Sequence, residues 1–65
     1  MKLPEKIKQY RIDHGLTQQE FADRGQLTRA VVEAIENERI ENPGMDTLIG
    51  IAKAMEISID ELVKE

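Results

Sequence analysis

Cysteine and tryptophan are absent from this sequence of 65 residues, which contains one phenylalanine, one tyrosine and one histidine. Without cysteine the chain can form neither a disulfide nor a thiolate zinc site, and a single histidine argues against other structural zinc sites. A domain of this size lies near the lower limit for folding without such cross-links. Its core must therefore come from aliphatic side chains, as is typical of a small helical bundle.

No stretch of the chain approaches the ~18 consecutive apolar residues that a membrane-spanning helix needs. Residues 1–6 also lack the apolar segment of a signal peptide. We therefore expect a soluble, cytoplasmic protein that forms one domain over residues 1–65.

The net charge of −4 is unevenly distributed along the chain. Residues 1–39 contain equal numbers of basic and acidic side chains, whereas residues 40–65 contain six acids and two lysines. A domain that binds DNA is expected to be basic on at least one face. The acidity therefore argues modestly against tight DNA binding, although a basic surface can still form in the first part of the chain.

Residues 15–37 contain the most informative pattern, two short helices joined by a tight turn. Thr17 precedes Glu20 by three residues, which is the spacing of a capping box, in which each side chain binds the backbone N–H of the other residue. Gly25 ends this helix, and Thr28 is placed to cap a second one. A helix, a turn of three to four residues and a second capped helix form the helix-turn-helix unit with which many proteins bind DNA.

The rest of the chain predicts three further helices, and no strand pattern competes with them. The five expected helices cover about residues 4–14, 17–24, 28–37 and 45–55, with a last one that starts at the Ser58 cap. We therefore predict an all-α, compact five-helix domain, and Leu3 and Ile12 extend the apolar face of its first helix less clearly. The expected core consists of Ile7, Tyr10, Leu16, Phe21, Ala22, Leu27, Val32, Ile35, Leu48, Ile51, Ala52, Met55, Ile57 and Leu62.

Taken together, these segments resemble the lambda-repressor-like, Cro/Xre-type helix-turn-helix domain of phage and bacterial regulators. The match extends from Ile7 to Val63 and keeps the order and spacing of the family. The matching segments are Ile7-x-x-Tyr10-Arg11, Gly15-Leu16-Thr17-Gln18-Gln19-Glu20-Phe21-Ala22, Ile35-Glu36-Asn37, Pro43-x-x-x-Thr47-Leu48, Ile51-Ala52-Lys53-Ala54-Met55 and Ile57-Ser58-Ile59-Asp60-Glu61-Leu62. Each segment is weak evidence alone, but the full set in order is specific.

The resemblance implies roles for individual residues. Gln18 would bind a DNA phosphate at the start of the second helix, and Arg11 and Glu36 would form an internal ion pair between the first helix and the end of the third. Thr28 would cap the third helix, which is the recognition helix. The residues that would face the major groove from this helix are Arg29, Ala30, Val31 and Ala34. Asn37 and Arg39, just after the helix, would touch the DNA backbone. The family dimerises through the segment after the third helix and through the fifth helix, where the available apolar residues are Ile40, Ile59 and Val63.

The sequence departs from the family pattern in the turn and on the recognition helix. Gln26 occupies the position that usually holds the glycine of the turn, and Gly25 comes one residue earlier. We expect Gln26 to adopt the left-handed conformation that glycine usually takes there. Val31 and Glu33 stand where small hydroxyl residues are common, and Glu38 stands where glycine is usual.

Several of these residues allow a second interpretation. Arg29 can bind O6 and N7 of guanine through its guanidinium, but a phosphate contact or a solvated side chain is the alternative. Ala30 and Val31 can pack on thymine methyl groups or on protein. Glu33 can accept from N4 of cytosine, although an acid beside phosphates is more often repulsive. Gln18 has no evident structural task, which favours the phosphate contact.

No pattern in the chain indicates catalysis or a cofactor. There is no Ser/His/Asp set, no phosphate-binding loop and no pair of carboxylates in a setting that would raise a pKa. Asp60, Glu61 and Glu65 suggest a cation site at first sight, but acids in the first turn of a helix are explained by the helix dipole. We therefore expect no enzyme, no cofactor and no metal site.

The sequence favours a sequence-specific DNA-binding transcriptional regulator, which we expect to be a repressor that binds double-stranded DNA as a homodimer on a palindromic site. The alternative is an acidic protein-interaction module, such as an antitoxin or antirepressor, that kept the fold and lost or weakened DNA binding. Gln18, Arg29, Asn37 and Arg39 favour the first interpretation, and the acidic balance, Val31 and Glu33 favour the second.

Overall fold

The computed structural model describes residues 2–64, and within them the chain forms five α-helices and no β-strand. The helices are α1 (Leu3–His14), α2 (Gln18–Arg24), α3 (Arg29–Glu36), α4 (Met45–Met55) and α5 (Ile59–Val63). The prediction of an all-α, five-helix domain is confirmed, with a helix-turn-helix formed by α2 and α3. The helix bounds lie close to those expected from the sequence because most of the start signals are local.

Side chains just before three of the helices bind the free N–H groups of the first turn. Thr17 Oγ1 accepts from the N–H of Glu20 at 3.0 Å, and Glu20 Oε1 accepts from the N–H of Thr17 at 2.8 Å, which completes the expected capping box of α2. Thr28 caps α3, and Ser58 caps α5 by accepting from the third residue of each helix. A cap of this kind contributes about 1 kcal/mol, which matters in a domain whose helices are as short as five residues.

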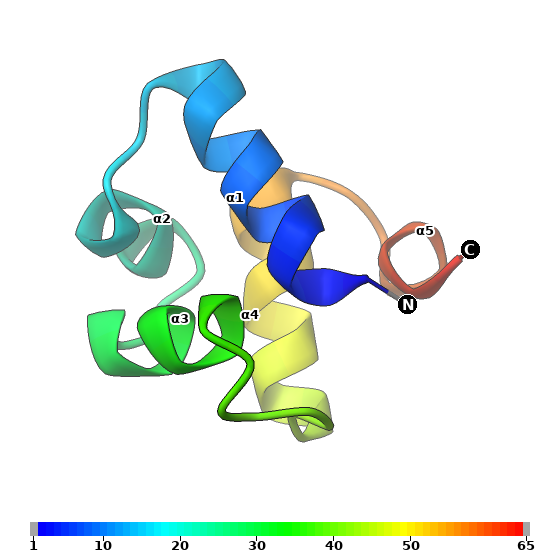
Figure 1. The fold of residues 1–65 in the computed structure, drawn as a ribbon. Helices are drawn as coiled ribbons and strands as arrows, with labels where there is room; N and C mark the ends of the chain where they lie inside the picture. The colour runs from blue at the N-terminus through cyan, green and yellow to red at the C-terminus, as the bar shows by residue number, and fades with distance from the viewer. Residues whose placement is uncertain (1, 65) are drawn as a thin grey trace.

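The helices are arranged so that the helix-turn-helix lies at one side of the domain. α2 packs against α3 and α4, α1 packs against α3, and α4 packs against α5. Figure 1 shows α2 and α3 together on one side and α5 on the opposite side, next to both ends of the described chain. Residues 28–30 at the start of α3 are exposed, so this end of α3 faces solvent.

The core is built from aliphatic side chains around one aromatic ring. Phe21 is the largest fully buried side chain, and its ring meets the ring of Tyr10 edge-on at a centroid distance of 6.0 Å. The buried apolar residues are Leu3, Ile7, Phe21, Ala22, Val32, Ile35, Ile51, Ala52, Ala54 and Leu62. The other residues of the expected core are partly buried against this cluster, and Ala54 is a buried residue that the sequence pattern did not single out.

Ile12 was expected, less clearly, on the apolar face of the first helix, and this expectation was wrong, because its side chain is 70% exposed. It follows the buried Ile7 by five residues, which turns it about 140° away around the helix axis. The first turn of α1 is covered instead by Leu3, which is buried. The apolar face of α1 therefore runs toward its N-terminus rather than its C-terminus.

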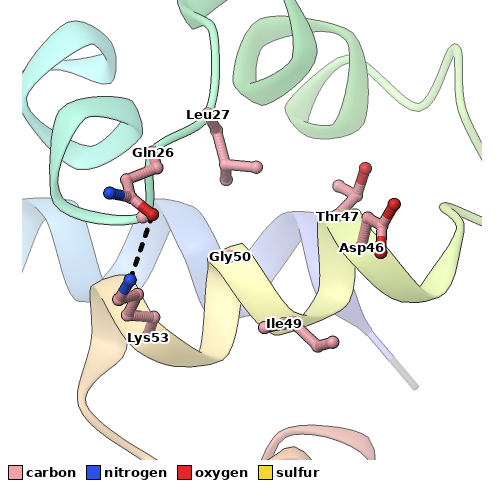
Figure 2. A pocket seen from close by; sticks show the side chains of 8 residues that line it. Gln26, Leu27, Asp46, Thr47, Ile49, Gly50 and Lys53 are labelled. Carbon is pink, nitrogen blue, oxygen red and sulfur yellow. Dashed lines mark hydrogen bonds between the residues drawn. The ribbon is translucent and has the colours of Figure 1, made fainter.

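The turn between α2 and α3 divides between two residues the tasks that one glycine usually performs. Gln26 has a φ of 57°, so the predicted left-handed conformation is confirmed. Gly25 has an ordinary φ of −102°, but a Cβ on it would lie 2.1 Å from the carbonyl oxygen of Gly50 in α4. Figure 2 shows Gln26 and Leu27 over α4, with Lys53 Nζ donating to Gln26 Oε1 at 3.1 Å. Gly25 is thus needed for the close approach of the turn to α4, not for its φ.

Candidate nucleic-acid interface

The N-terminal ends of α2 and α3 lie side by side and are joined by their first residues. Gln18 opens α2 and Arg29 opens α3, and Arg29 Nη1 donates to Gln18 Oε1 at 3.4 Å. Thr28 and Arg29 are exposed and Gln18 is half-buried. The fold therefore brings the residue expected to contact phosphate and the residue expected to read a base to one surface.

A buried ion pair holds this surface against the rest of the domain. Arg11 Nε and Nη2 donate to the two carboxylate oxygens of Glu36 at 2.7 Å each, and Arg11 Nη1 donates to the carbonyl of Leu16 at 3.1 Å. The Glu36 side chain is 2% exposed and that of Arg11 is 19% exposed. The pair joins α1 to the last residue of α3, in the place that the resemblance implies, and a two-pronged contact of this kind fixes direction as well as distance.

The hydrogen bonds that Arg11 donates to the Glu36 carboxylate raise the pKa of Arg11 above its usual value, against the opposing effect of burial. A cation whose pKa is raised by folding contributes stability that is fully present at lower pH and is lost only as the pH rises through that raised value. For an arginine this lies at strongly alkaline pH. Arg11 therefore stays charged at any pH at which DNA binding would be measured.

Glu36 also reaches the exposed surface through Gln18, a contact that the sequence did not indicate. Gln18 Nε2 donates to Glu36 Oε1 at 3.3 Å. Since the amide group is held by its nitrogen on this side, its oxygen faces Arg29. Gln18 thus has the structural task that sequence reasoning could not name, and no local spacing would have revealed it, because Gln18 lies in α2 and its two partners lie in α3.

The side of α3 that follows Arg29 carries small and apolar side chains. Ala30 is exposed, Ala34 is half-buried, and Val31 is half-buried and packs against the core. The packing of Val31 on the core of its own domain reduces the surface that it offers to a thymine methyl group or to another protein. Ala30 and Ala34, one helical turn apart, are the apolar groups that α3 leaves accessible beyond Arg29.

Asn37 and Arg39, the residues expected to touch the DNA backbone after α3, both bind one carboxylate. Asn37 Nδ2 donates to Glu33 Oε2 at 2.8 Å, and Arg39 Nη2 is paired with Glu33 Oε1. The Arg39 side chain is 60% exposed and that of Glu33 is 31% exposed. Sequence reasoning named Asn37 and Arg39 but missed that Glu33 holds them, although the spacing of four between Glu33 and Asn37 on a helix is a usable signal.

The residues expected at a dimer interface lie near the start of α1 and on α5. Ile40 is half-buried and lines an open hollow with Leu3 and Pro4, while Ile59 is half-buried against the core. Val63 is 39% exposed. Two of the three side chains thus already contact their own domain.

Every buried polar side-chain atom of the described residues has a hydrogen-bond partner within the domain. Within residues 2–64 no three side chains of the metal-binding kinds are grouped so that they could hold an ion. None of the helices formed by these residues is long and apolar enough to cross a membrane.

A family model described as helix-turn-helix matches residues 7–62, which is most of the chain. The chain belongs to this helix-turn-helix family. The Cro/Xre-type resemblance is thereby confirmed, and the chain is a DNA-binding type of domain rather than an enzyme.

A solved structure titled as a complex of the SinR protein with the SinI protein contains a chain of the same fold. The two chains are 25% identical with a TM-score of 0.82, and the match covers 97% of the present chain and 61% of the other. The present chain thus spans less than two thirds of its structural relative. No curated protein matches the sequence.

Proposed function

We propose that this protein is a sequence-specific transcriptional regulator that inserts α3 into the major groove of DNA. The observation that carries the proposal is the hydrogen bond between Gln18 and Arg29, which brings the N-terminal ends of α2 and α3 to one exposed surface. The N–H groups at helix N-termini attract phosphate, and a guanidinium beside them is placed to enter the groove between two phosphate rows.

Contacts to the DNA backbone and to the bases fall to different residues in this proposal. Gln18 and the caps around Thr28 bind phosphates at the start of the two helices, and Asn37 and Arg39 bind them beyond α3. Arg29 is the strong base reader, since a guanidinium can donate to O6 and N7 of one guanine. Ala30 and Ala34 contact thymine methyl groups beside it, and Val31 adds only the edge of its side chain because it also packs on the core.

We infer that the protein acts as a homodimer on a palindromic site. One module of this size buries little DNA surface, and two copies related by a twofold axis would read two half-sites about 34 Å apart. Ile40, Ile59 and Val63 are the side chains proposed for contact between copies. Repression follows most simply, because occupying a stretch of DNA suffices to exclude another protein, whereas activation needs an additional contact. A regulator of this kind acts in the cytoplasm.

Selection of bound fragments from a random DNA pool tests the proposal directly. The expected result is an inverted repeat with guanine at one fixed position of each half-site, and binding that rises steeply with protein concentration as dimers form. Recovery of no preferred sequence, at low salt and at protein concentrations of roughly 100 µM, the weak end of the non-specific range, would refute DNA regulation by this chain.

The second candidate function is a protein-interaction module, for which two observations speak. Glu33 cancels the charge of Arg39, and the structural relative is recorded in a complex with another protein, SinI. The same selection experiment separates the candidates. A failed selection combined with a normally folded protein would leave the interaction module as the better reading.

A further inference from the structure

Glu33 binds the side chains of both Asn37 and Arg39, which are the residues after α3 that are proposed to contact DNA. Its Oε2 accepts from Asn37 Nδ2 at 2.8 Å, and its Oε1 is paired with Arg39 Nη2. The carboxylate therefore already fills the place beside Arg39 and Asn37 that a phosphate oxygen would take. A carboxylate and a phosphate offer the same two-oxygen acceptor geometry to a guanidinium.

The two ends of α3 therefore differ in the positive charge that they can offer to DNA. At the N-terminal end, Arg29 is bound by the neutral amide oxygen of Gln18, so its charge stays available. At the C-terminal end the charge of Arg39 is cancelled by Glu33. Sequence-independent affinity for DNA comes from cations that replace counterions on the phosphates. The paired end of α3 can supply none of this affinity while the pair is intact.

The geometry also argues against two other roles for Glu33, which are reading a base and stabilising the fold. If Glu33 read a base, its carboxylate oxygens would have to face the groove, but each already accepts a hydrogen bond from the segment at the end of α3. If Glu33 served the fold, it would be buried like Glu36, yet its side chain is 31% exposed against 2%. The remaining role of Glu33 is to bind Asn37 and Arg39.

We propose that Glu33 is an internal competitor of DNA phosphate, which holds Asn37 and Arg39 and thereby lowers sequence-independent binding without changing base choice. This inference rests on the proposed DNA-binding function. It assigns to Glu33 a uniform lowering of the affinity for DNA, which leaves unchanged the ratio between binding to the operator and binding to random sites.

The test compares Glu33→Gln with Glu5→Gln in titrations of a preferred and a random duplex at several salt concentrations. Glutamine keeps the size of the side chain, and Glu5 is an exposed acid in the first turn of α1, so both variants change the net charge equally. One additional phosphate contact steepens the salt dependence by about 0.9 per tenfold change in salt. The ratio of the affinity at 0.1 M salt to the affinity at 1 M salt should therefore gain about eightfold.

The expected result is this gain for Glu33→Gln on both duplexes, with an unchanged ratio between them and no comparable gain for Glu5→Gln. Weaker binding by Glu33→Gln would overturn the proposal and identify Glu33 as the support that holds Arg39 toward DNA. A change of preference at one base pair without a common gain would overturn it in favour of base reading, and equal gains in both variants would reduce it to net charge. Wild-type binding with no gain refutes this inference alone, whereas absence of binding by wild type and variants alike removes the proposed function as well.

Discussion

Replacing Glu36 by alanine is expected to destabilise the domain strongly, because it strands a largely buried guanidinium. Glu36 accepts two hydrogen bonds from Arg11 at 2.7 Å and one from Gln18 at 3.3 Å. Removing one member of a buried pair typically costs 3–5 kcal/mol, and because the Arg11 side chain is 19% exposed, we expect about 3 kcal/mol. In a domain of this length that lowers the melting temperature by roughly 12–24 °C.

The matched control is Glu33→Ala, which removes an acid of the same helix whose pair with Arg39 is mostly solvated. Such pairs contribute about 1 kcal/mol or less, so the melting temperature should fall by no more than about 8 °C. Thermal unfolding followed by circular dichroism measures both. Equal, small shifts would refute the reasoning, since they would mean that Glu36 behaves as a surface acid.

A double variant separates the loss of the pair from the stranding of its partner. Arg11→Met combined with Glu36→Leu replaces both charges by apolar side chains of similar length, and such replacements are often neutral or stabilising. This variant should recover most of the stability lost in Glu36→Ala. If it is no more stable than the single variant, the destabilisation comes from the packing around Glu36 and not from an unpaired Arg11.

Phe21→Ala should cost about 3–5 kcal/mol, because it empties the centre of the core; an unchanged melting curve would show that its burial is misassigned. Gln26→Gly should relieve the strain of a left-handed residue and stabilise the domain by up to about 1 kcal/mol. Gly25→Ala should cost more than the ~1–3 kcal/mol of ordinary overpacking, because the new Cβ would clash with the backbone of Gly50. The reverse order of stability in a denaturant titration would contradict these two roles. Arg29→Ala should cost about 1–3 kcal/mol on the preferred duplex and relax the choice at one base pair, and equal weakening on random DNA would make Arg29 a phosphate contact instead.

Most of the fold could be predicted from the sequence because its determinants are local. Thr17, Thr28 and Ser58 each begin a helix through a bond to the third residue that follows, and such spacings are visible in the sequence. The apolar period of α4 gives its bounds in the same way. The assignment of Ile12 failed because one misplaced apolar residue cannot be distinguished by period alone in a helix that carries few others.

The candidate interface was only partly predictable, because its contacts join residues that are distant in the sequence. The positions of Gln18, Arg29 and Arg39 followed from the resemblance, but their partners did not. The partner of Gln18 is Glu36, and a hydrogen bond between α2 and α3 depends on the angle at which the two helices pack. The need for Gly25 is likewise invisible in the sequence, since the carbonyl that it accommodates belongs to Gly50 in α4.

Stability and DNA contact are joined in this chain by Glu36. Its carboxylate is bound by Arg11 on the buried side and by the amide of Gln18 on the surface side, and the oxygen of that amide is the acceptor for Arg29. Loss of Glu36 would therefore free the Gln18 amide to rotate and would release Arg29 even in molecules that remain folded. Arg11→Met with Glu36→Leu separates the two effects, because it restores stability without restoring the acceptor for Gln18. We expect this variant to melt close to the wild type while binding the preferred duplex more weakly, which would show that the ion pair serves the surface as well as the core.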